Sequence, residues 1–426
     1  MAARTINSVS FSSMLLFWSY AALLALLIVP ANIIYQRFFH PLHRFPGPYW
    51  ASLTILWYAR AVRYGISENY QRPLHEKYGQ FVRIAPSMLS VSNPLAIDTI
   101  YGLASGAVLQ KAAFYDGFNP HLGGRRDAFS ERDEQAHTER RRIVAPLYTQ
   151  GTVLKYEHRF DKVIARFMER MSGYCNSSEV FDMADCLRKY AHDVIGDLYY
   201  GYEGGFADAD YNNWVQLTET VPDFGAAFSY LPTPFRELFM LSQLVFKGSR
   251  EGMLGFFRVI RSAKEATNDR VKEMADGQTE GKDDFLSKLL DIAHTKGQDI
   301  NFTVRDVATE IWNIVWGGSD TTAILLTAVF YLMHKHPATL EKLRLEIDDA
   351  FASGRLSSPV KFTDANKLLY LRAVILEATR FHTSLGVGLP RLVPPQGIEI
   401  CGQWVPGNTT VLMNPPVVSE MLPACF

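Results

Sequence analysis

One segment, residues 303–335, limits the possible folds of this chain more than any other. Its apolar positions keep a helical period until Pro337, and Thr303 with Asp306 three residues later can cap the first turn. At 1.5 Å per residue, about thirty residues give a helix of about 45 Å, enough to run through the middle of a large domain. We therefore expect the rest of the chain to pack around this helix.

The middle of this helix, residues 311–330, is apolar on nearly every side, unlike a helix at a protein surface. Two interpretations follow, a central core helix or a second membrane span. Polar residues interrupt the run, and an aspartate at the centre of a bilayer is costly, so we favour the core. These polar residues are Asn313, Ser319, Asp320, Thr321 and Thr322.

A second apolar segment lies near the N-terminus, where residues 14–35 carry no charge. It is long enough to cross a hydrocarbon core of about 30 Å, and longer than the apolar region of a cleavable signal peptide, about 7 to 15 residues. Arg37 and Arg44 follow it, so the positive-inside rule places the rest of the chain in the cytosol. We expect a lumenal tail over residues 1–13 and a single-pass transmembrane anchor over residues 14–35.

Residues 36–48 connect this anchor to the body of the protein. The segment is basic, and the prolines in FPGP at its end predict a stiff, extended hinge. We expect residues 49–426 to form the body of the protein, mainly α with a small β portion. Two short β-favouring runs, Phe81 to Ile84 and Met88 to Val91, predict a hairpin. Helical periods cover roughly residues 134–150, 154–172, 179–200, 250–275, 338–352 and 366–382.

Composition excludes several classes of protein. The 43 Lys+Arg against 44 Asp+Glu lack the basic surplus of a nucleic-acid-binding chain, so we expect no nucleic acid partner. The 48% hydrophobic residues suffice for a large core. The four cysteines show no Cys-x-x-Cys spacing, which favours a reduced, cytosolic body. The sequence contains no Gly-x-Ser-x-Gly elbow and no phosphate-binding glycine loop, which argues against a hydrolase of that type and against direct nucleotide binding.

The centre of the long helix combines two adjacent glycines, Gly317 and Gly318, with an acid and a hydroxyl, Asp320 and Thr321. Glycines cost about 1 kcal/mol each inside a helix, so we expect a structural reason for them. A bulky flat group could press against the backbone there, and the acid and hydroxyl could pass protons to a bound substrate. Alternatively, the small residues mark a close helix crossing with satisfied polar groups. These residues alone leave both interpretations open.

Two further pairs have helical spacing. His137 and Arg141 would share one helix face at about 5 to 6 Å and could hold two carboxylates, or could simply form a solvated basic surface. Glu377 and Arg380 could form an ion pair, but Glu139 has the same spacing to a following arginine, so the spacing alone is uninformative.

The order of these features resembles the cytochrome P-450 superfamily of haem-thiolate monooxygenases. The matching runs, after the anchor and the proline hinge, are HTERRR at 137–142, GGSDTT at 317–322, ILEATR at 375–380 and GLPRLVP at 388–394. Among that family, the chain is most similar to filamentous-fungal, microsomal members such as pisatin demethylase. The resemblance extends from the anchor to about Val418 and implies the cytochrome P-450 fold.

The resemblance assigns roles to the residues in the long helix. Asp320 and Thr321 match the acid–alcohol pair that delivers protons during oxygen activation. Gly317 and Gly318 match the residues that open the helix and make room for oxygen beside the haem.

Three basic residues match the family's contacts to the haem propionates. They are His137, Arg141 and Arg391, so the resemblance implies haem b as cofactor. Glu377 and Arg380 match a structural Glu-x-x-Arg pair that fastens its helix to a later coil.

The implied protein inserts one oxygen atom of O₂ into a small lipophilic substrate, as in fungal secondary metabolism. The resemblance places it in the endoplasmic reticulum membrane. Because the chain has no nucleotide-binding loop, electrons from NADPH would arrive through a separate NADPH-cytochrome reductase.

The sequence departs from the family at the iron ligand, a cysteine in a Phe-x-x-Gly-x-Arg-x-Cys-x-Gly loop. Cys425 lacks the preceding Gly and Arg and follows Arg391 too soon, so we judge it not equivalent and assign no metal ligand. We expect a fold that lacks the C-terminal haem-ligand segment. The alternative function is a catalytically dead, truncated, membrane-anchored remnant that binds a partner or lipophilic ligand, or has no function.

Overall fold

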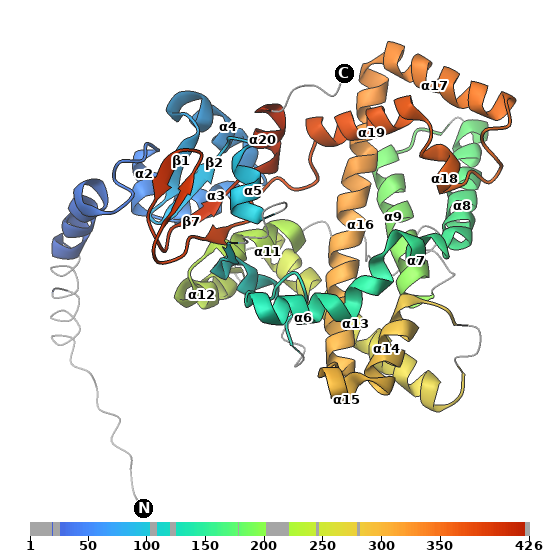
Figure 1. Cartoon of the computed structure of the whole chain (residues 1–426), viewed down its shortest axis with the longest axis horizontal. Helices are drawn as coiled ribbons and strands as arrows, with labels where there is room; N and C mark the ends of the chain where they lie inside the picture. The colour runs from blue at the N-terminus through green and yellow to red at the C-terminus, as the bar shows by residue number, and fades with distance from the viewer. Residues whose placement is uncertain are drawn as a thin grey trace, which may run out of the picture.

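The computed structural model describes residues 19, 26–102, 109–119, 125–177, 179–201, 221–243, 247–278 and 282–421. Most of this part of the chain is helical, and two small sheets lie beside the helices (Figure 1). The expected mainly α fold with a small β portion is confirmed.

The helices and strands have the following bounds. The helices are η1 (Tyr35–Phe39), α2 (Tyr49–Leu53), α3 (Leu56–Arg63), α4 (Ser67–Tyr78), α5 (Ala96–Tyr101), η2 (Ala113–Phe118), α6 (Glu134–Val144), η3 (Ala145–Tyr148), α7 (Gln150–Leu154), α8 (Glu157–Ser177), α9 (Met183–Tyr200), α11 (Val221–Tyr230), α12 (Thr233–Gln243), α13 (Lys247–Ala275), α14 (Phe285–Thr295), α15 (Gly297–Ile300), α16 (Val304–Lys335), α17 (Pro337–Ala352), α18 (Phe362–Ala365), α19 (Leu369–Phe381) and α20 (Pro415–Met421). The strands are β1 (Phe81–Ala85), β2 (Met88–Val91), β3 (Gln110–Lys111), β4 (Arg391–Leu392), β5 (Ile398–Ile400), β6 (Gln403–Val405) and β7 (Thr410–Leu412).

The expected central helix is α16, and it starts where its capping residues predict. Thr303 and Asp306 form the reciprocal capping box. The helix packs against α9, α13, α14 and α19, and it runs through the helical part of the molecule (Figure 1). Ile311 and Trp312 are fully buried, so the core interpretation is confirmed for the N-terminal half of α16.

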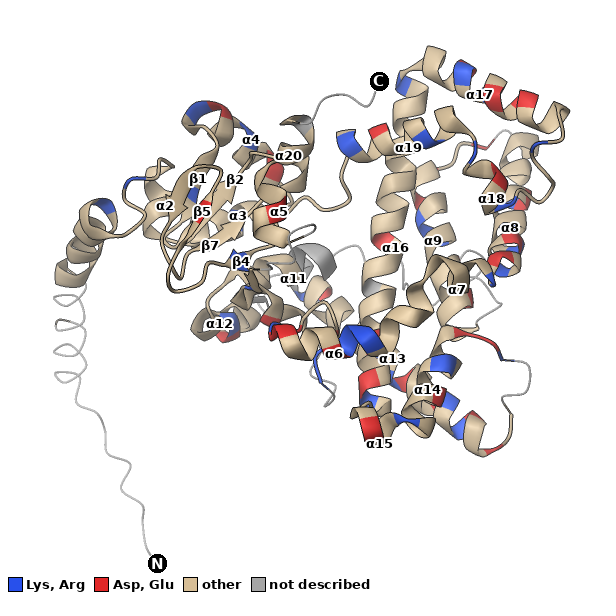
Figure 2. Ribbon diagram, viewed as in Figure 1, with Lys and Arg blue, Asp and Glu red and all other residues tan. Residues whose placement is uncertain are grey.

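The C-terminal half of α16 is less covered than its composition predicts. Ile324, Phe330 and Tyr331 are exposed, and part of this surface borders a cavity of about 700 Å³ between α9, α16 and the end of α19. Figure 2 shows that α16 carries few charges through its middle, whereas α8, α13 and α14 carry many. Within the described residues, α16 is also the one helix long and apolar enough to cross a membrane.

The expected hairpin is confirmed and starts the larger sheet. β1 and β2 pair antiparallel, with Phe81 opposite Val91, and β2 continues parallel to β7. The sheet then adds β4 and β3, in the order β1-β2-β7-β4-β3. This topology places β4, which comes late in the sequence, beside β3, which comes from the first third of the sequence. The smaller sheet consists of β5 and β6.

One predicted helix is divided. Residues 134–150 have a continuous helical period, but α6 ends at Val144 and is followed by η3 and α7. Pro146 lacks the backbone N–H that would continue the helix, which explains the break.

The described part of the expected anchor is the apolar helix Leu26–Phe39. Its side chains are largely exposed, including Leu26 and Leu27, and its last turn is the π-helix η1. Apart from Ser19, the first part of the expected anchor, residues 14–25, lies outside the described residues.

The segment expected to act as a hinge packs on the larger sheet. The backbone N of Arg83 on β1 donates to the Pro46 carbonyl at 2.8 Å. Its Nη1 donates to the Gln36 carbonyl at 2.9 Å and its Nη2 to Gln36 Oε1 at 2.6 Å. Proline stiffness was recognisable in the sequence, and the structure adds that β1 contacts the linker near both of its ends.

Gly47 in this linker should tolerate no side chain. A Cβ on Gly47 would collide with the Arg83 carbonyl, so Gly47→Ala must push the linker away from β1. We expect a loss of about 1–3 kcal/mol in the free energy of unfolding, measured by urea denaturation. Gly173→Ala in α8 is the matched control, because its Cβ would meet nothing within 4 Å and should stabilise the helix by about 0.5–1 kcal/mol. Equal effects of the two substitutions would contradict this account.

Candidate functional site

Arg391 projects from β4 into a partly buried aromatic and cationic environment. Its guanidinium carbon lies 5.0 Å from the ring centre of Tyr101 and 5.5 Å from that of Tyr115. Its Nη1 donates to Tyr115 Oη at 2.6 Å. Its Nε is buried and has no hydrogen-bond partner among the described residues. A buried donor without an acceptor is costly, so this guanidinium is arranged to receive a further acceptor.

Lys111 on β3 lies directly opposite Arg391 in the sheet. Burial, and after it the positive charge of Arg391, lower the pKa of Lys111 to about 8. Its Nζ donates to the carbonyls of Ala128 and Phe129 at 2.8 and 3.0 Å. Sequence reasoning missed Lys111, because a two-residue strand gives no periodic signal and the cross-strand partner follows far later in the chain.

His137 on α6 adds a third group to the same neighbourhood. Burial lowers the pKa of His137, and so do the nearby charges of Lys111 and Arg141, whereas Glu134 raises it. His137 Nδ1 lies 3.4 Å from Glu134 Oε1. Arg141 is exposed on the same helix. We call Lys111, His137, Arg141 and Arg391 the cation cluster.

The chemistry of the cation cluster fits a bound dicarboxylate. Its members come from β3, β4 and α6. Arg391 lowers the pKa of Lys111, and Lys111 and Arg141 lower the pKa of His137, so a bound anion would relieve this repulsion. Charge-assisted hydrogen bonds from arginine, lysine and histidine to carboxylates are the strong ones. The propionates at the edge of a haem meet this description, so the residues present fit that part of the cofactor.

Helix α6 divides the HTERRR run between two environments. Asp133 caps the helix by accepting from the Ala136 backbone N at 2.8 Å. Arg140 is 2% exposed and faces α16. Its Nε contacts Glu310 Oε1 at 2.6 Å and its Nη1 contacts Asp306 Oδ1 at 3.0 Å. Arg140 therefore fastens α6 to α16, which sequence reasoning missed. Two acids four residues apart on an apolar helix were the signal for a buried cation.

Glu310, as part of this triad, makes the free energy of unfolding of the protein depend on pH. Burial raises the pKa of Glu310 from 4.5 to about 7, against the lowering effect of Arg140. Between pH 4.5 and about 7 the folded protein binds more protons than the unfolded chain does. The free energy of unfolding therefore falls as the pH rises through this interval. Glu310→Gln should lack this contribution to the pH dependence. The difference in free energy of unfolding between variant and parent should therefore change by about 2–3 kcal/mol between pH 4.5 and 7. Urea denaturation across this range tests it, and parallel profiles of parent and variant would contradict it.

The glycine pair lies within a continuous α-helix, because α16 is helical from Val304 to Lys335 without a break. A Cβ on Gly318 would lie 3.0 Å from Ile195 Cδ1, so α9 crosses α16 closely at this point. A Cβ on Gly317 would meet nothing within 4 Å. The helix crossing thus accounts for Gly318, while Gly317 borders open space.

The acid and the hydroxyl that follow occupy different surroundings. Asp320 lines the cavity of about 700 Å³, together with Arg188 of α9 and Phe381 at the end of α19. Thr321 is half-buried, and its Oγ1 donates to the Gly317 carbonyl at 2.9 Å. Ser384 Oγ donates to the Thr321 carbonyl at 2.8 Å.

Ser384 connects the two parts of the candidate site. Residues 384–390 lead directly from this contact with α16 to Arg391 on β4. The second connection is the Arg140 triad between α6 and α16. Residues 384–390 thus connect the helix region around Thr321 to Arg391, whereas the Arg140 triad fastens α6 nearer the N-terminal end of α16, at Asp306 and Glu310.

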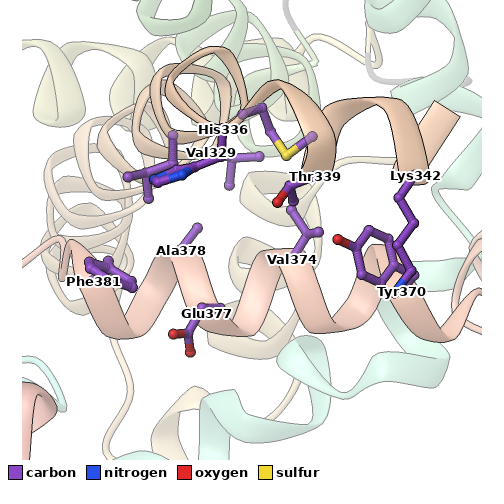
Figure 3. A pocket seen from close by; sticks show the side chains of 11 residues that line it. Val329, His336, Thr339, Lys342, Tyr370, Val374, Glu377, Ala378 and Phe381 are labelled. Carbon is purple, nitrogen blue, oxygen red and sulfur yellow. The ribbon is translucent and has the colours of Figure 1, made fainter. Parts of the chain in front are cut away.

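Glu377 and Arg380 form a bidentate ion pair on α19. Arg380 Nε and Nη2 donate to Glu377 at 2.9 and 2.6 Å, and Arg380 Nη1 donates to the Ser419 carbonyl of α20 at 3.3 Å. A cavity of about 340 Å³ lies between α16, α17 and α19. In Figure 3, Val374 and Ala378 face this cavity, whereas the Glu377 carboxylate points away from it.

The described cysteines lie outside this region. Cys175 is exposed on α8, Cys186 lines a cavity between α8 and α9, and Cys401 is exposed between β5 and β6. Cys425, which we judged not equivalent to the family's ligand, lies outside the described residues.

Comparison with known proteins agrees with this picture. The family model "Cytochrome P450" matches residues 44–420. The chain is 35% identical to cytochrome P450 monooxygenase gsfF of Penicillium aethiopicum, over 91% of this chain and 77% of that protein. It is 30% identical to cytochrome P450 monooxygenase hepC of Aspergillus oryzae, over 93% and 78% of the two chains. It is also 30% identical to pisatin demethylase of Fusarium vanettenii, over 89% and 72%. With a mainly helical fold, small sheets and this match over most of its length, the chain belongs to the cytochrome P450 family, whose members are haem monooxygenases acting on small substrates.

Proposed function

We propose that this chain is a haem b monooxygenase that oxidises a small lipophilic substrate of fungal secondary metabolism. It would insert one oxygen atom of O₂ and receive electrons from NADPH through a separate NADPH-cytochrome reductase. The observation that carries this proposal is the pairing of Lys111 with Arg391 across β3 and β4, beside a buried Arg391 Nε that has no hydrogen-bond partner among the described residues. The kinds of relative that match, including pisatin demethylase, support the substrate class.

In this proposal the cation cluster holds the haem propionates. Arg391 and Lys111 approach from the sheet, and His137 and Arg141 approach from α6. A haem held at this edge would supply the oxygen chemistry of the family. The ion pair of Glu377 and Arg380 serves structure, because it ties α19 to α20.

The residues around the middle of α16 would supply protons for the reaction and leave room for oxygen beside the helix. Asp320 borders an open cavity, so solvent can supply protons to its carboxylate. The neighbouring Thr321 holds its proton against the Gly317 carbonyl, and rotation of its side chain would free that proton for the reaction. Gly317 leaves space beside the helix for oxygen, and Gly318 lets α9 approach.

The proposed location is the endoplasmic reticulum membrane with the catalytic body in the cytosol. Residues 1–13 would be lumenal, residues 14–35 would span the bilayer, residues 36–48 would form the docked linker and residues 49–426 the catalytic domain. The exposed apolar side chains of the helix Leu26–Phe39 support this arrangement, because such a surface is stable only when covered by lipid or protein.

Deletion of residues 1–34 should release the protein from microsomal membranes, partly or wholly. The deletion removes apolar side chains that lipid would cover but keeps Gln36, and with it the contact to Arg83 that holds the linker. The measurement is the fraction of protein in the supernatant after a high-salt wash, with the full chain as control. Complete retention of the shortened protein would show that other surfaces bind the membrane.

The direct test of the proposed function is a carbon monoxide difference spectrum of the reduced protein in microsomes. A thiolate-type band would support it. Bound haem without that band would mean that the iron lacks a thiolate ligand, and no haem signal would refute the cofactor assignment.

A second candidate function is a membrane-anchored protein that binds a lipophilic ligand without chemistry. The specific observation in its favour is that none of the described cysteines shares an element with the cation cluster or α16. The same spectrum separates the two candidates, because a non-catalytic protein would show no thiolate-type band.

A further inference from the structure

Residues 384–390 form an irregular segment between the contact of Ser384 with α16 and Arg391 on β4. The segment joins α19 to β4 without helix or strand, and it contains Gly386 and Gly388. Backbone carbonyls that receive no ladder hydrogen bond need other partners when they are buried. With two glycines, this segment would otherwise sample many conformations.

Two buried side chains from distant parts of the chain bind its glycine carbonyls. Tyr230, the last residue of α11, donates from Oη to the Gly388 carbonyl at 2.6 Å. Asn414, between β7 and α20, donates from Nδ2 to the Gly386 carbonyl at 3.2 Å. Both side chains are buried, Tyr230 to 5% exposure and Asn414 to 0%. The next carbonyl, of Leu389, accepts from Tyr101 Oη at 3.1 Å.

Tyr230 and Asn414 are also joined to each other through one buried network. The rings of Tyr230 and Tyr58 meet edge to face at 4.9 Å between centroids, and their hydroxyls are hydrogen-bonded. Ser67 Oγ donates to Tyr58 Oη at 3.4 Å and accepts from Asn414 Nδ2 at 3.5 Å. Gln71 reinforces both groups, donating to Tyr58 Oη at 3.2 Å and to Ser67 Oγ at 3.0 Å. The hydrogen bonds therefore form a closed circuit that begins and ends on the glycine segment.

The segment packs closely against β7 and the residue after it at Gly388. A Cβ on Gly388 would lie 2.5 Å from Leu412 Cδ1 and 2.9 Å from the Met413 carbonyl. Glycine at this position allows the backbone to touch the strand directly, and the Tyr230 hydroxyl then holds it there.

We propose that Tyr230 and Asn414 are positioning residues, which hold residues 384–390 in one path and thereby set Arg391 relative to Thr321. The segment begins at the contact between Ser384 and the Thr321 carbonyl and ends at Arg391, whose Nε finds no acceptor in the described part of the chain. A shift of Gly388 would therefore move Arg391 directly. The consequence for Arg391 rests on the proposed function, whereas the clamp on the segment does not.

The test compares Tyr230→Phe with Tyr199→Phe by hydrogen exchange of the full chain. Each substitution removes one buried tyrosine hydroxyl and keeps the ring, and Tyr199 in α9 has its hydrogen bond to Tyr148 instead. Tyr230→Phe should raise the exchange of peptides covering residues 384–391 about tenfold, as expected for one lost buried hydrogen bond. Tyr199→Phe should leave those peptides unchanged.

Two further variants keep the test decisive if Tyr230→Phe folds poorly. Tyr58→Phe leaves the bond from Tyr230 to Gly388 in place, so it should raise exchange less than Tyr230→Phe does. Asn414→Ala removes the bond to Gly386 and should raise exchange in the same peptides. Unchanged exchange of residues 384–391 in Tyr58→Phe and Asn414→Ala, or equal exchange in the Phe variants of Tyr230 and Tyr199, would overturn the clamp.

A second readout tests the consequence for Arg391. If haem binds, Tyr230→Phe should shift the propionate-bending bands in the resonance Raman spectrum, and Tyr199→Phe should not. Unchanged bands together with faster exchange would overturn the link to Arg391. If the parent chain takes up no haem, the proposed function fails, and the exchange comparison alone decides whether the clamp exists.

Discussion

Arg140→Met is expected to lower the free energy of unfolding by about 3–5 kcal/mol, the largest effect of any single substitution considered. The substitution keeps most of the side-chain volume but leaves Asp306 and Glu310 buried on α16 without a cation. Removing one partner of a buried ion pair is costly because the remaining charge cannot recover its hydration. Urea denaturation at neutral pH measures the loss.

The matched control for this substitution is its neighbour. Arg141→Met removes the same charge from the same helix, but Arg141 is exposed, so stability should change by less than about 0.5 kcal/mol. Adding Glu310→Gln to Arg140→Met should restore part of the lost stability, because one uncompensated carboxylate disappears. Equal stability losses in Arg140→Met and Arg141→Met would show that the buried triad does not hold α6 to α16.

Arg391→Met is expected to weaken haem binding by about 10- to 100-fold, the second large effect. The substitution removes the guanidinium whose Nε has no acceptor among the residues that the structure describes, and with it the charge-assisted hydrogen bonds proposed for the propionates. Titration of the haem-free protein with haemin, followed by Soret absorbance, measures the change.

Three further variants test whether the effect on haem affinity is specific to the cation cluster. Arg391→Lys keeps the charge but not the planar fork, so its affinity should lie between those of parent and Arg391→Met. Arg355→Met removes an exposed arginine paired with Asp349 and should leave affinity unchanged. Lys111→Met should weaken binding like Arg391→Met. Equal affinity of the parent and Arg391→Met would refute the cation cluster as the site of the propionates.

Much of the site could be anticipated from sequence only because of the family resemblance. His137 and Arg141 are far from Arg391 in the chain, and nothing in their spacing indicates that both α6 and β4 lie near Lys111 of β3. Lys111 had no motif, yet the sheet order places it directly opposite Arg391. Pairing between strands that are distant in sequence depends on the packing of the whole domain, which local patterns do not encode.

The glycine pair of α16 shows the same limit within one motif. Two glycines inside a helix predicted that another group lies close to the helix backbone. Either a flat cofactor or a second helix could be that group. The structure separates the two residues, with α9 against Gly318 and open space beside Gly317. Adjacent residues on a helix point about 100° apart, so their neighbours belong to different elements.

Sequence by itself determined the local elements of this protein, namely the capping box that starts α16, the β1–β2 hairpin and most helix positions. These features depend on residues within a few positions of each other, so periodicity and capping chemistry suffice. Tertiary structure alone decided that Arg140 is buried while Arg141 is exposed. The two arginines have the same chemistry, and their different environments arise because only one of them faces the carboxylates of α16.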